Sequence, residues 1–248
     1  MLSKEYRTKT PDSGPHGLAA DKDGNIWFTA SFQGYIGKLD PKTGTIIEYH
    51  LPDPAARDPH TPVFDRTGVL WFTVQGANMV GRLVPQTGEV MLQPVPTPNA
   101  LPYGIAVNSA GVPVLAEFGS NKLASIDPAT MTIHEYTLPN PESRPRRIAI
   151  TPDDAIWYTD YAGGHLGRFD PKTRQRERVA FAWWRELGTL WDRRREGRFV
   201  VQRVGCEPEH PRAVRSEDGE VSNLGYSFGG RGGAQYDGDE GRQPRPSL

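Results

Sequence analysis

Residues 15–29 read Pro-His-Gly-Leu-Ala-Ala-Asp-Lys-Asp-Gly-Asn-Ile-Trp-Phe-Thr, and related segments return at intervals of 43–44 residues to make four copies. Equivalent positions align almost without gaps. Each copy starts with a proline, at Pro15, Pro59, Pro102 and Pro145, and has a Trp or Val twelve residues later, at Trp27, Trp71, Val114 and Trp157. Ten residues further on is a small residue, at Gly37, Gly81, Ala124 and Gly167. A second proline follows, at Pro41, Pro85, Pro128 and Pro171. Repetition at this period is typical of propeller blades.

Each copy has the pattern of four short β-strands. In the first copy, apolar runs at 17–20, 26–30, 36–39 and 46–50 are separated by turn residues. Such runs predict strands joined by hairpins, and no segment shows the periodicity of an amphipathic helix. The sequence therefore predicts an all-β fold, a β-propeller of four-stranded blades, with four legible blades within residues 1–180. We expect the repeated Trp to fill the space between neighbouring sheets.

Composition narrows the classes of partner and compartment. A net charge of −1 argues against a nucleic-acid partner, and one cysteine excludes a disulfide framework and a cysteine-based zinc site. No apolar run is long enough to predict a membrane span. Residues 1–14 lack the apolar stretch of a secretory signal, so the cytoplasm is the default location.

The first residues resemble the end of a blade. Lys4-Glu5-Tyr6 echoes Ile47-Glu48-Tyr49 and His134-Glu135-Tyr136, which belong to the last predicted strand of their copies. We therefore expect the chain to begin inside a blade. Either this strand closes the ring against the final blade or the start is truncated, and localisation stays open for that reason.

Residues 181–248 differ chemically from the repeats. Residues 1–180 contain seven lysines and eleven arginines, whereas residues 181–248 contain eleven arginines and no lysine, isoleucine or methionine. Glycine-rich stretches such as 229–233 add to the contrast. One interpretation is a disordered Arg/Gly-rich tail. The other is an aberrant tail made by frame-shifted translation of further blades.

The genetic code favours the frameshift. Trp183-Trp184 must be encoded TGG TGG, which reads Gly-Gly when shifted by one base. Codons for Gly188–Arg194 permit Gly-Pro-Tyr-Gly-Ile-Ala-Val, close to residues 101–107, and those for Gly233–Leu248 permit an Asp-Gly-Asn turn. Such a tail cannot complete a ring, which leaves sheet edges unprotected. We expect a monomer if the propeller is complete and an aggregation-prone chain as it stands.

The first copy resembles the virginiamycin B lyase family. The resemblance rests on residues 15–29, on Ile-Gly-Lys-Leu-Asp at 36–40 and on Glu-Tyr-His-Leu-Pro at 48–52, and it extends over residues 4–180. It implies a seven-bladed parent and a carbon–oxygen lyase. These enzymes linearise type B streptogramin antibiotics, which are cyclic depsipeptides, by elimination at the ester bond with the help of Mg²⁺. We expect the present chain to be impaired by its tail.

The resemblance also implies a site. The family has histidines at the Pro-His position, an acid two residues before one of them and a Glu fourteen residues after it. His16 and His60 occupy the Pro-His position and are the predicted catalytic residues. Asp58, His60 and Glu117 are the predicted Mg²⁺ ligands. Val74 stands where the metal-binding Glu is expected, and this loss of a carboxylate puts Mg²⁺ binding in doubt.

Two further copies carry other side chains at the Pro-His position, Tyr103 and Arg146. Because innermost strands of a propeller begin at one mouth of its channel, we expect both residues to ring a common opening with the two histidines. Asp160 occupies the acid slot of the fourth copy and should lie nearby. Tyr103, Arg146 and Asp160 are the predicted substrate-binding residues.

Other interpretations of these residues are open. Each could simply line the channel or cap a loop, and the basic cluster around Arg144 and Arg147 could meet an anionic ligand or only solvent. The alternative function is a non-catalytic propeller that binds a small molecule or a protein partner at the channel mouth. A lactonase-type calcium propeller shares the fold, but no set of ligands specifies it.

Overall fold

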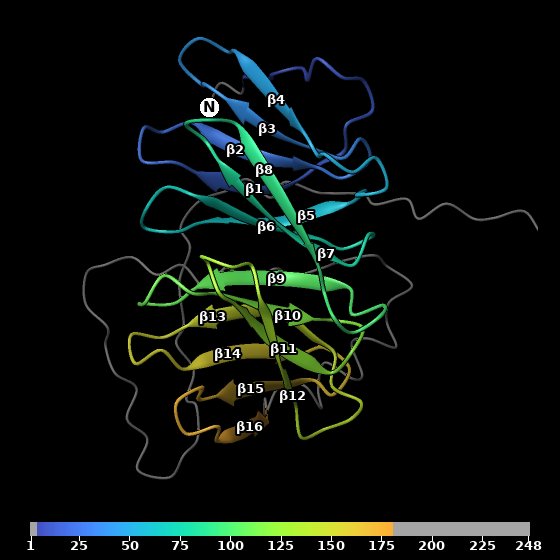
Figure 1. Ribbon diagram of the computed structural model, residues 1–248, viewed down its shortest axis with the longest axis vertical. Coiled ribbons are helices and arrows are strands. Elements are labelled where there is room, and N and C mark those ends of the chain that lie inside the picture. The colour runs from blue at the N-terminus through green and yellow to red at the C-terminus, as the bar shows by residue number, and fades with distance from the viewer. Residues whose placement is uncertain (1–3, 181–248) are drawn as a thin grey trace, which may run out of the picture. The chain divides into compact units, whose positions relative to one another are not determined.

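The computed structural model describes residues 4–180, which form four separate four-stranded antiparallel sheets (Figure 1). Within this part of the chain no helix occurs, and so none could cross a membrane. The predicted all-β propeller blades are confirmed. The predicted aberrant tail, residues 181–248, lies outside the described residues.

Each sheet is a meander whose strands pair in chain order. The first two sheets comprise β1 Pro15–Ala20, β2 Ile26–Ala30, β3 Tyr35–Leu39 and β4 Ile46–His50, then β5 Pro59–Phe64, β6 Leu70–Val74, β7 Met79–Val84 and β8 Glu89–Pro94. The last two comprise β9 Pro102–Val107, β10 Pro113–Glu117, β11 Lys122–Ile126 and β12 Ile133–Thr137, then β13 Pro145–Ile150, β14 Ile156–Asp160, β15 His165–Phe169 and β16 Arg176–Ala180. We call them blades 1 to 4. The strands predicted in the first copy agree with β1–β4 to within two residues.

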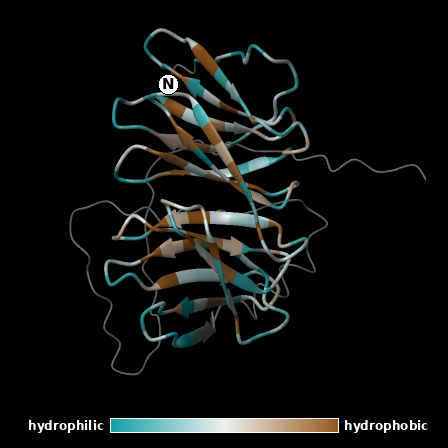
Figure 2. Ribbon diagram, viewed as in Figure 1, coloured by the Kyte–Doolittle hydropathy of each residue, from teal (hydrophilic) through white to brown (hydrophobic). Residues whose placement is uncertain are grey.

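The first strands of the blades lie side by side. β1 contacts β5, β5 contacts β9 and β9 contacts β13, so their starting residues meet along one line (Figure 1). Hydrophobic residues concentrate in the strands and hydrophilic residues in the turns between them (Figure 2). The repeat therefore places the same sequence position of each blade next to its counterpart in the following blade.

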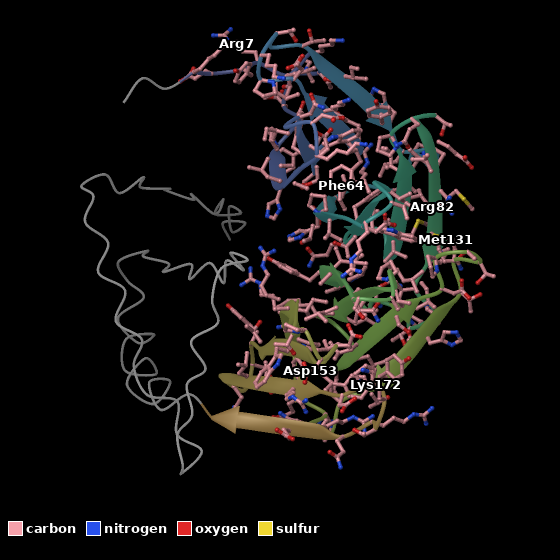
Figure 3. All side chains as sticks on the ribbon, turned by 90° about the vertical axis from the view of Figure 1, so that its left-hand side faces the viewer. Arg7, Phe64, Arg82, Met131, Asp153 and Lys172 are labelled. Carbon is pink, nitrogen blue, oxygen red and sulfur yellow. The ribbon has the colours of Figure 1, made fainter. Side chains whose placement is uncertain are left out.

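The hydrophobic core lies between successive blades. Trp27 of blade 1 is fully buried in one cluster with Leu70 and Phe72 of blade 2, and Trp71 is buried against Ile105 and Leu115 of blade 3. Side chains fill the space between the sheets (Figure 3), where the ring of Phe64 stands edge-on 5.7 Å from the Trp27 ring. The expectation that the Trp fills this space is confirmed for Trp27 and Trp71, whereas Trp157 of blade 4 is only half-buried. Because each blade shares its core with the next, a blade cannot bury it alone.

The repeated small residue has a steric cause. Gly81 on β7 pairs with Phe72 on β6, and a Cβ atom at Gly81 would lie 2.1 Å from the Phe72 ring. Blades 1 and 4 repeat this pairing of a glycine with an aromatic residue. In blade 3 the small residue is Ala124, and its partner on β10 is the smaller Leu115. The size of one partner therefore sets the size of the other.

The prediction of a strand at Lys4–Tyr6 is wrong: in the described residues, the first strand is β1. The side chain of Tyr6 instead packs on blade 1, where its hydroxyl donates a hydrogen bond to the Pro41 carbonyl at 2.9 Å. Tyr6 faces Gly44 as Tyr49 faces Gly88 in the next blade. The similarity of Lys4–Tyr6 to residues 47–49 therefore reflects the same tyrosine–glycine contact, which forms here without strand pairing.

Candidate functional site

Four side chains from the second position of the first strands form a continuous row. The rings of His16 and His60 lie 4.1 Å apart between centroids, and those of His60 and Tyr103 lie 4.1 Å apart. The Arg146 guanidinium is 4.7 Å from the Tyr103 ring, and its Nη2 donates a 2.7 Å hydrogen bond to the Tyr103 hydroxyl. The predicted gathering of these four residues is confirmed, and their chemical roles stay predictions.

A threonine on the second strand of the blade links neighbouring members of this row. The hydroxyl of Thr29 accepts a hydrogen bond from the Gly17 amide at a bulge in β1 and donates one to the His60 carbonyl of blade 2. Thr73 makes the same two kinds of contact, with the Thr61 amide and the Tyr103 carbonyl. A β-bulge re-aims the side chains beside it. Each threonine therefore holds its own bulge and the next blade's site residue together.

His60 is neutral at physiological pH. Burial, and after it the charges of His16 and of the two arginines Arg147 and Arg146, lowers the pKa of the His60 imidazole from 6.5 to about 3. Its side chain is only 5% exposed, and Nδ1 lies 2.9 Å from the Thr61 hydroxyl. His16, by contrast, is exposed. The two adjacent histidines therefore differ in their access to water.

Asp58 lies beside the histidines in a strained conformation. Its φ of 62° places it in the left-handed region, and its amide donates to the Ser31 carbonyl at 3.0 Å while its carbonyl accepts from the Gln75 amide at 2.9 Å. Burial raises the pKa of its carboxyl group, which hydrogen bonding to Ser31 and the charge of His16 oppose. The loop before β5 thus places this acid close to His16.

Glu117 is a buried acid at the end of β10. Oε2 accepts a hydrogen bond from the Ser120 hydroxyl, whereas Oε1 is buried without a partner among the described residues. Burial raises the pKa of this carboxyl group from 4.5 to about 7, and the nearby Glu135 adds to the rise. Glu117 is therefore close to half protonated at neutral pH.

Asp160, in the same slot of blade 4, holds a loop in place. Its carboxylate accepts hydrogen bonds from the Ser143 hydroxyl at 2.9 Å, the Gly163 amide at 3.0 Å and the Arg144 amide at 3.4 Å. These contacts account for its burial, as the loop-capping interpretation of the sequence predicts. Its assignment to substrate binding stays a prediction.

Two aromatic residues at this edge escaped the sequence analysis. Phe118 and Tyr161 directly follow the acid slots of blades 3 and 4, and their rings lie 5.7 Å apart. Phe118 is also 5.7 Å from Tyr103. An aromatic residue after the acid in two consecutive copies was the available signal. Thr29 and Thr73 were visible in the repeated Trp-Phe-Thr segment as well.

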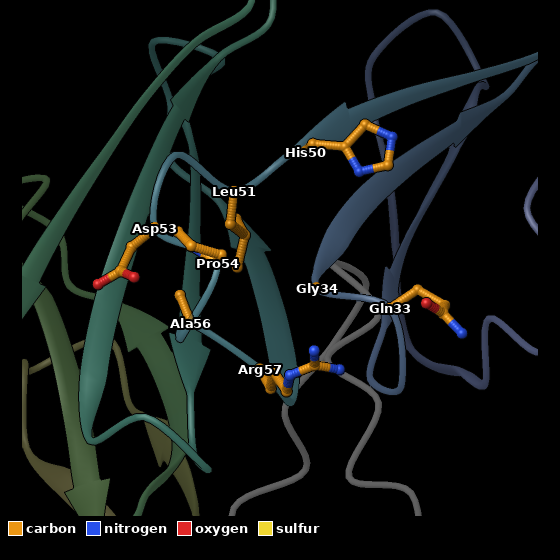
Figure 4. Close-up of a pocket in the computed structure, with 8 residues that line it drawn as sticks. All are labelled: Gln33, Gly34, His50, Leu51, Asp53, Pro54, Ala56 and Arg57. Atoms are coloured by element: carbon orange, nitrogen blue, oxygen red, sulfur yellow. The ribbon is translucent and has the colours of Figure 1, made fainter.

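A cavity of about 260 Å³ lies apart from this row (Figure 4). It is formed by the β2–β3 turn and the β4–β5 connection, and it is lined by Gln33, Gly34, His50, Leu51, Asp53, Pro54, Ala56 and Arg57. None of the predicted site residues lines it. We therefore place the candidate site at the row of first-strand residues.

Comparison with known sequences identifies the family. The sequence pattern of the virginiamycin B lyase family matches residues 2–179. The chain belongs to this family. No curated protein sequence matches the chain.

Solved structures of virginiamycin B lyase family members are similar to the chain. A streptogramin B lyase structure is 32% identical with a TM-score of 0.67, and the match covers 72% of this chain and 58% of that one. Virginiamycin B lyase from Staphylococcus aureus is 29% identical with a TM-score of 0.67, covering 72% and 59%. The same figures hold for a catalytically inactive variant of the S. aureus enzyme with quinupristin. The chain thus spans less than two thirds of the length of these proteins.

The described residues of this virginiamycin B lyase family member do not assemble a magnesium site. Within residues 4–180, no group of three or more His, Cys, Asp or Glu side chains is arranged to hold a metal ion. Val74, fully buried, supplies no oxygen where an acid was expected. A hard cation needs several oxygen ligands. Asp58, His60 and Glu117 alone therefore do not fit Mg²⁺.

Proposed function

We propose that the site belongs to a lyase that linearises type B streptogramin antibiotics by elimination at the ester bond. The observation that carries the proposal is the row of His16, His60, Tyr103 and Arg146, which places two imidazoles, a phenol and a guanidinium next to one another. Family membership and the likeness to streptogramin-inactivating enzymes support it. The substrate would be a small-molecule cyclic depsipeptide.

The proposed chemistry needs a base and a site for the released carboxylate. A base removes the proton from the carbon next to a carbonyl group, the electron pair forms a carbon–carbon double bond, and the bond between the adjacent carbon and the ester oxygen breaks. We assign the proton transfer to His16, because histidine is the most frequent general base and this side chain is exposed beside His60. His60 is a weak base, with its pKa lowered to about 3, and serves as a neutral hydrogen-bonding neighbour.

We further propose that the 248-residue chain is impaired. The match covers only 58–59% of each of the structures to which the chain is similar. The proposed frameshift would replace further blades, and with them any ligands for the Mg²⁺ that the family implies. Sequencing the DNA around codons 176–183 tests the frameshift directly. An undisturbed reading frame would argue against it.

Turnover of quinupristin tests the lyase. The 248-residue chain and a frame-corrected gene product are each incubated with quinupristin, with and without Mg²⁺. Elimination gives a linear product with the mass of the substrate and a new double bond, whereas hydrolysis adds the mass of water. We expect turnover by the frame-corrected form and none by the 248-residue chain. No turnover by the frame-corrected form would end the lyase assignment.

A histidine variant and a matched control locate the activity. In the frame-corrected form, His16→Ala should abolish turnover, because it removes the proposed base. His134→Ala removes an exposed histidine from the outermost strand β12 and should leave turnover unchanged. Equal rates in both variants would place the chemistry elsewhere.

The alternative is a non-catalytic propeller that binds a small molecule or a protein partner at the same mouth. The lack of a metal-binding group within residues 4–180 and the presence of Val74 favour it. A form that binds quinupristin saturably and returns it unchanged would establish this alternative.

A further inference from the structure

The guanidinium of Arg146 lies among three aromatic rings. Its carbon is 4.7 Å from the ring centroid of Tyr103, 5.0 Å from that of Tyr161 and 6.0 Å from that of Phe118. Nη2 donates to the Tyr103 hydroxyl, but Nε is buried and has no hydrogen-bond partner among the described residues. A buried donor without a partner destabilises a fold, so this atom calls for an acceptor.

Two more arginines border the same rings. The Arg144 guanidinium lies 3.9 Å from the Phe118 ring centroid, and that of Arg147 lies 4.9 Å from the Tyr103 centroid. Both side chains are exposed. We call this group the arginine–aromatic cluster; its members are Tyr103, Phe118, Arg144, Arg146, Arg147 and Tyr161.

Within residues 4–180, the three positive charges are not paired with carboxylates. No ion pair of the described residues includes Arg144, Arg146 or Arg147. Their field extends along the row, because Arg147 and Arg146 both help to suppress protonation of His60. Like charges held together at a partly buried site raise the local concentration of anions.

We propose that the arginine–aromatic cluster binds an organic carboxylate that carries an apolar or aromatic group. The carboxylate would accept hydrogen bonds from Arg146 and Arg147, since a guanidinium presents two parallel donors that match its two oxygens. The apolar group would lie against Phe118 and Tyr161, which are half-buried. The aromatic walls favour such a ligand over a small, strongly hydrated anion such as inorganic phosphate. This proposal does not depend on turnover.

Benzoate is the probe of choice, and benzyl alcohol is its neutral counterpart. The arginine Nε–H signals of the nitrogen-labelled 248-residue protein are followed by NMR during titration at low ionic strength with benzoate, benzyl alcohol or inorganic phosphate. We expect saturable chemical-shift changes with benzoate. Binding should be at least about tenfold weaker for benzyl alcohol, which lacks the carboxylate, and for phosphate, which lacks the aromatic ring. Equal affinity for benzoate and benzyl alcohol, or for benzoate and phosphate, would overturn the proposal.

Substitutions place the binding in the cluster. Arg146→Gln should weaken benzoate binding by about tenfold or more, since it removes the central charge. Arg66→Gln, in the exposed turn at the far end of β5, removes one charge elsewhere and should leave binding unchanged. Unchanged binding in Arg146→Gln would refute the site.

Two further variants test the site if Arg146→Gln does not fold. If Arg146→Gln loses its native circular dichroism spectrum, Arg147→Gln and Tyr103→Phe take its place. The first removes an exposed charge, and the second removes only the hydroxyl that fixes the Arg146 guanidinium. Both should weaken benzoate binding severalfold with the fold intact. Wild-type affinity in both would overturn the proposal.

Discussion

Blades 1 and 2 and blades 3 and 4 place opposite chemistry at equivalent backbone positions. In the first pair the row carries His16 and His60 with an acid, Asp58, two residues before the second histidine. In the second pair it carries Tyr103 and Arg146, and Arg144 stands at the position of Asp58. The β-sheet scaffold is therefore indifferent to these side chains. The row therefore has a histidine half, in blades 1 and 2, and an arginine half, in blades 3 and 4.

One strongly buried group in each half, His60 and Glu117, has a shifted pKa, and the two pKa values move in opposite directions. Burial lowers the pKa of His60 to about 3 and raises that of Glu117 to about 7. Desolvation disfavours the charged form of either group, so both shifts favour neutrality. Under the proposed elimination, the histidine half would take the proton and the arginine half would hold the carboxylate that is released.

The largest expected effect concerns the core between the halves. Trp71 is almost fully buried at the boundary of blades 2 and 3, and its Nε1 donates to the Asp65 carboxylate at 2.8 Å. Trp71→Ala should lower the free energy of unfolding by about 3–5 kcal/mol because it leaves a large cavity. Trp157→Ala, at the equivalent but half-buried position of blade 4, should cost less than about half of this. Urea unfolding measures both, and equal losses would contradict the difference between the boundaries.

A smaller effect should follow from exchanging the glycine–aromatic pair of blade 2 for the pair of blade 3. Gly81→Ala places a Cβ atom against the Phe72 ring and should cost about 1–3 kcal/mol of unfolding free energy. Phe72→Leu in the same chain imitates Leu115 opposite Ala124 and should relieve the clash. The double variant should therefore lose less stability than the sum of the single ones. Strict additivity would show that the pair is not coupled.

The third expected effect is a pH dependence of stability, which differs in sign between Glu117 of the arginine half and His60 of the histidine half. The folded pKa of Glu117, about 7, exceeds the ordinary value of 4.5. Its contribution to stability is therefore fully present below pH 4.5 and is lost as the pH rises to about 7. His60 acts in the opposite sense, since its lowered pKa costs stability as the pH falls below 6.5.

Comparison with a variant isolates the Glu117 contribution. Glu117→Gln keeps the shape of the side chain and removes its titration. In the presence of a chelator, the ratio of the unfolding equilibrium constants of wild type and Glu117→Gln should rise on the order of a hundredfold between pH 4.5 and 7.5. His60 cancels in this ratio because both proteins contain it. A ratio independent of pH would mean that Glu117 is not buried as a neutral acid.

Much of the fold was predictable from the sequence because the repeat reports the same contacts four times. Turn residues and short apolar runs located the strands of the first blade to within two residues. The shared position of His16, His60, Tyr103 and Arg146 predicted that they meet. Lys4–Tyr6 was the exception. Its similarity to the last strand of a blade reflects the packing of the Tyr6 side chain on blade 1, and this contact does not require strand pairing.

The sequence by itself determined the four blades, the family and the identity of the row, because these depend on local periodicity and on equivalence between copies. Only the tertiary structure decided how these residues act on one another. Burial between blades favours the neutral forms of His60 and Glu117, and the close approach of β9 and β13 puts the Arg146 charge among the rings of Tyr103, Phe118 and Tyr161. Desolvation and the distances between charges are properties of residues far apart in the chain, so no local pattern contains them.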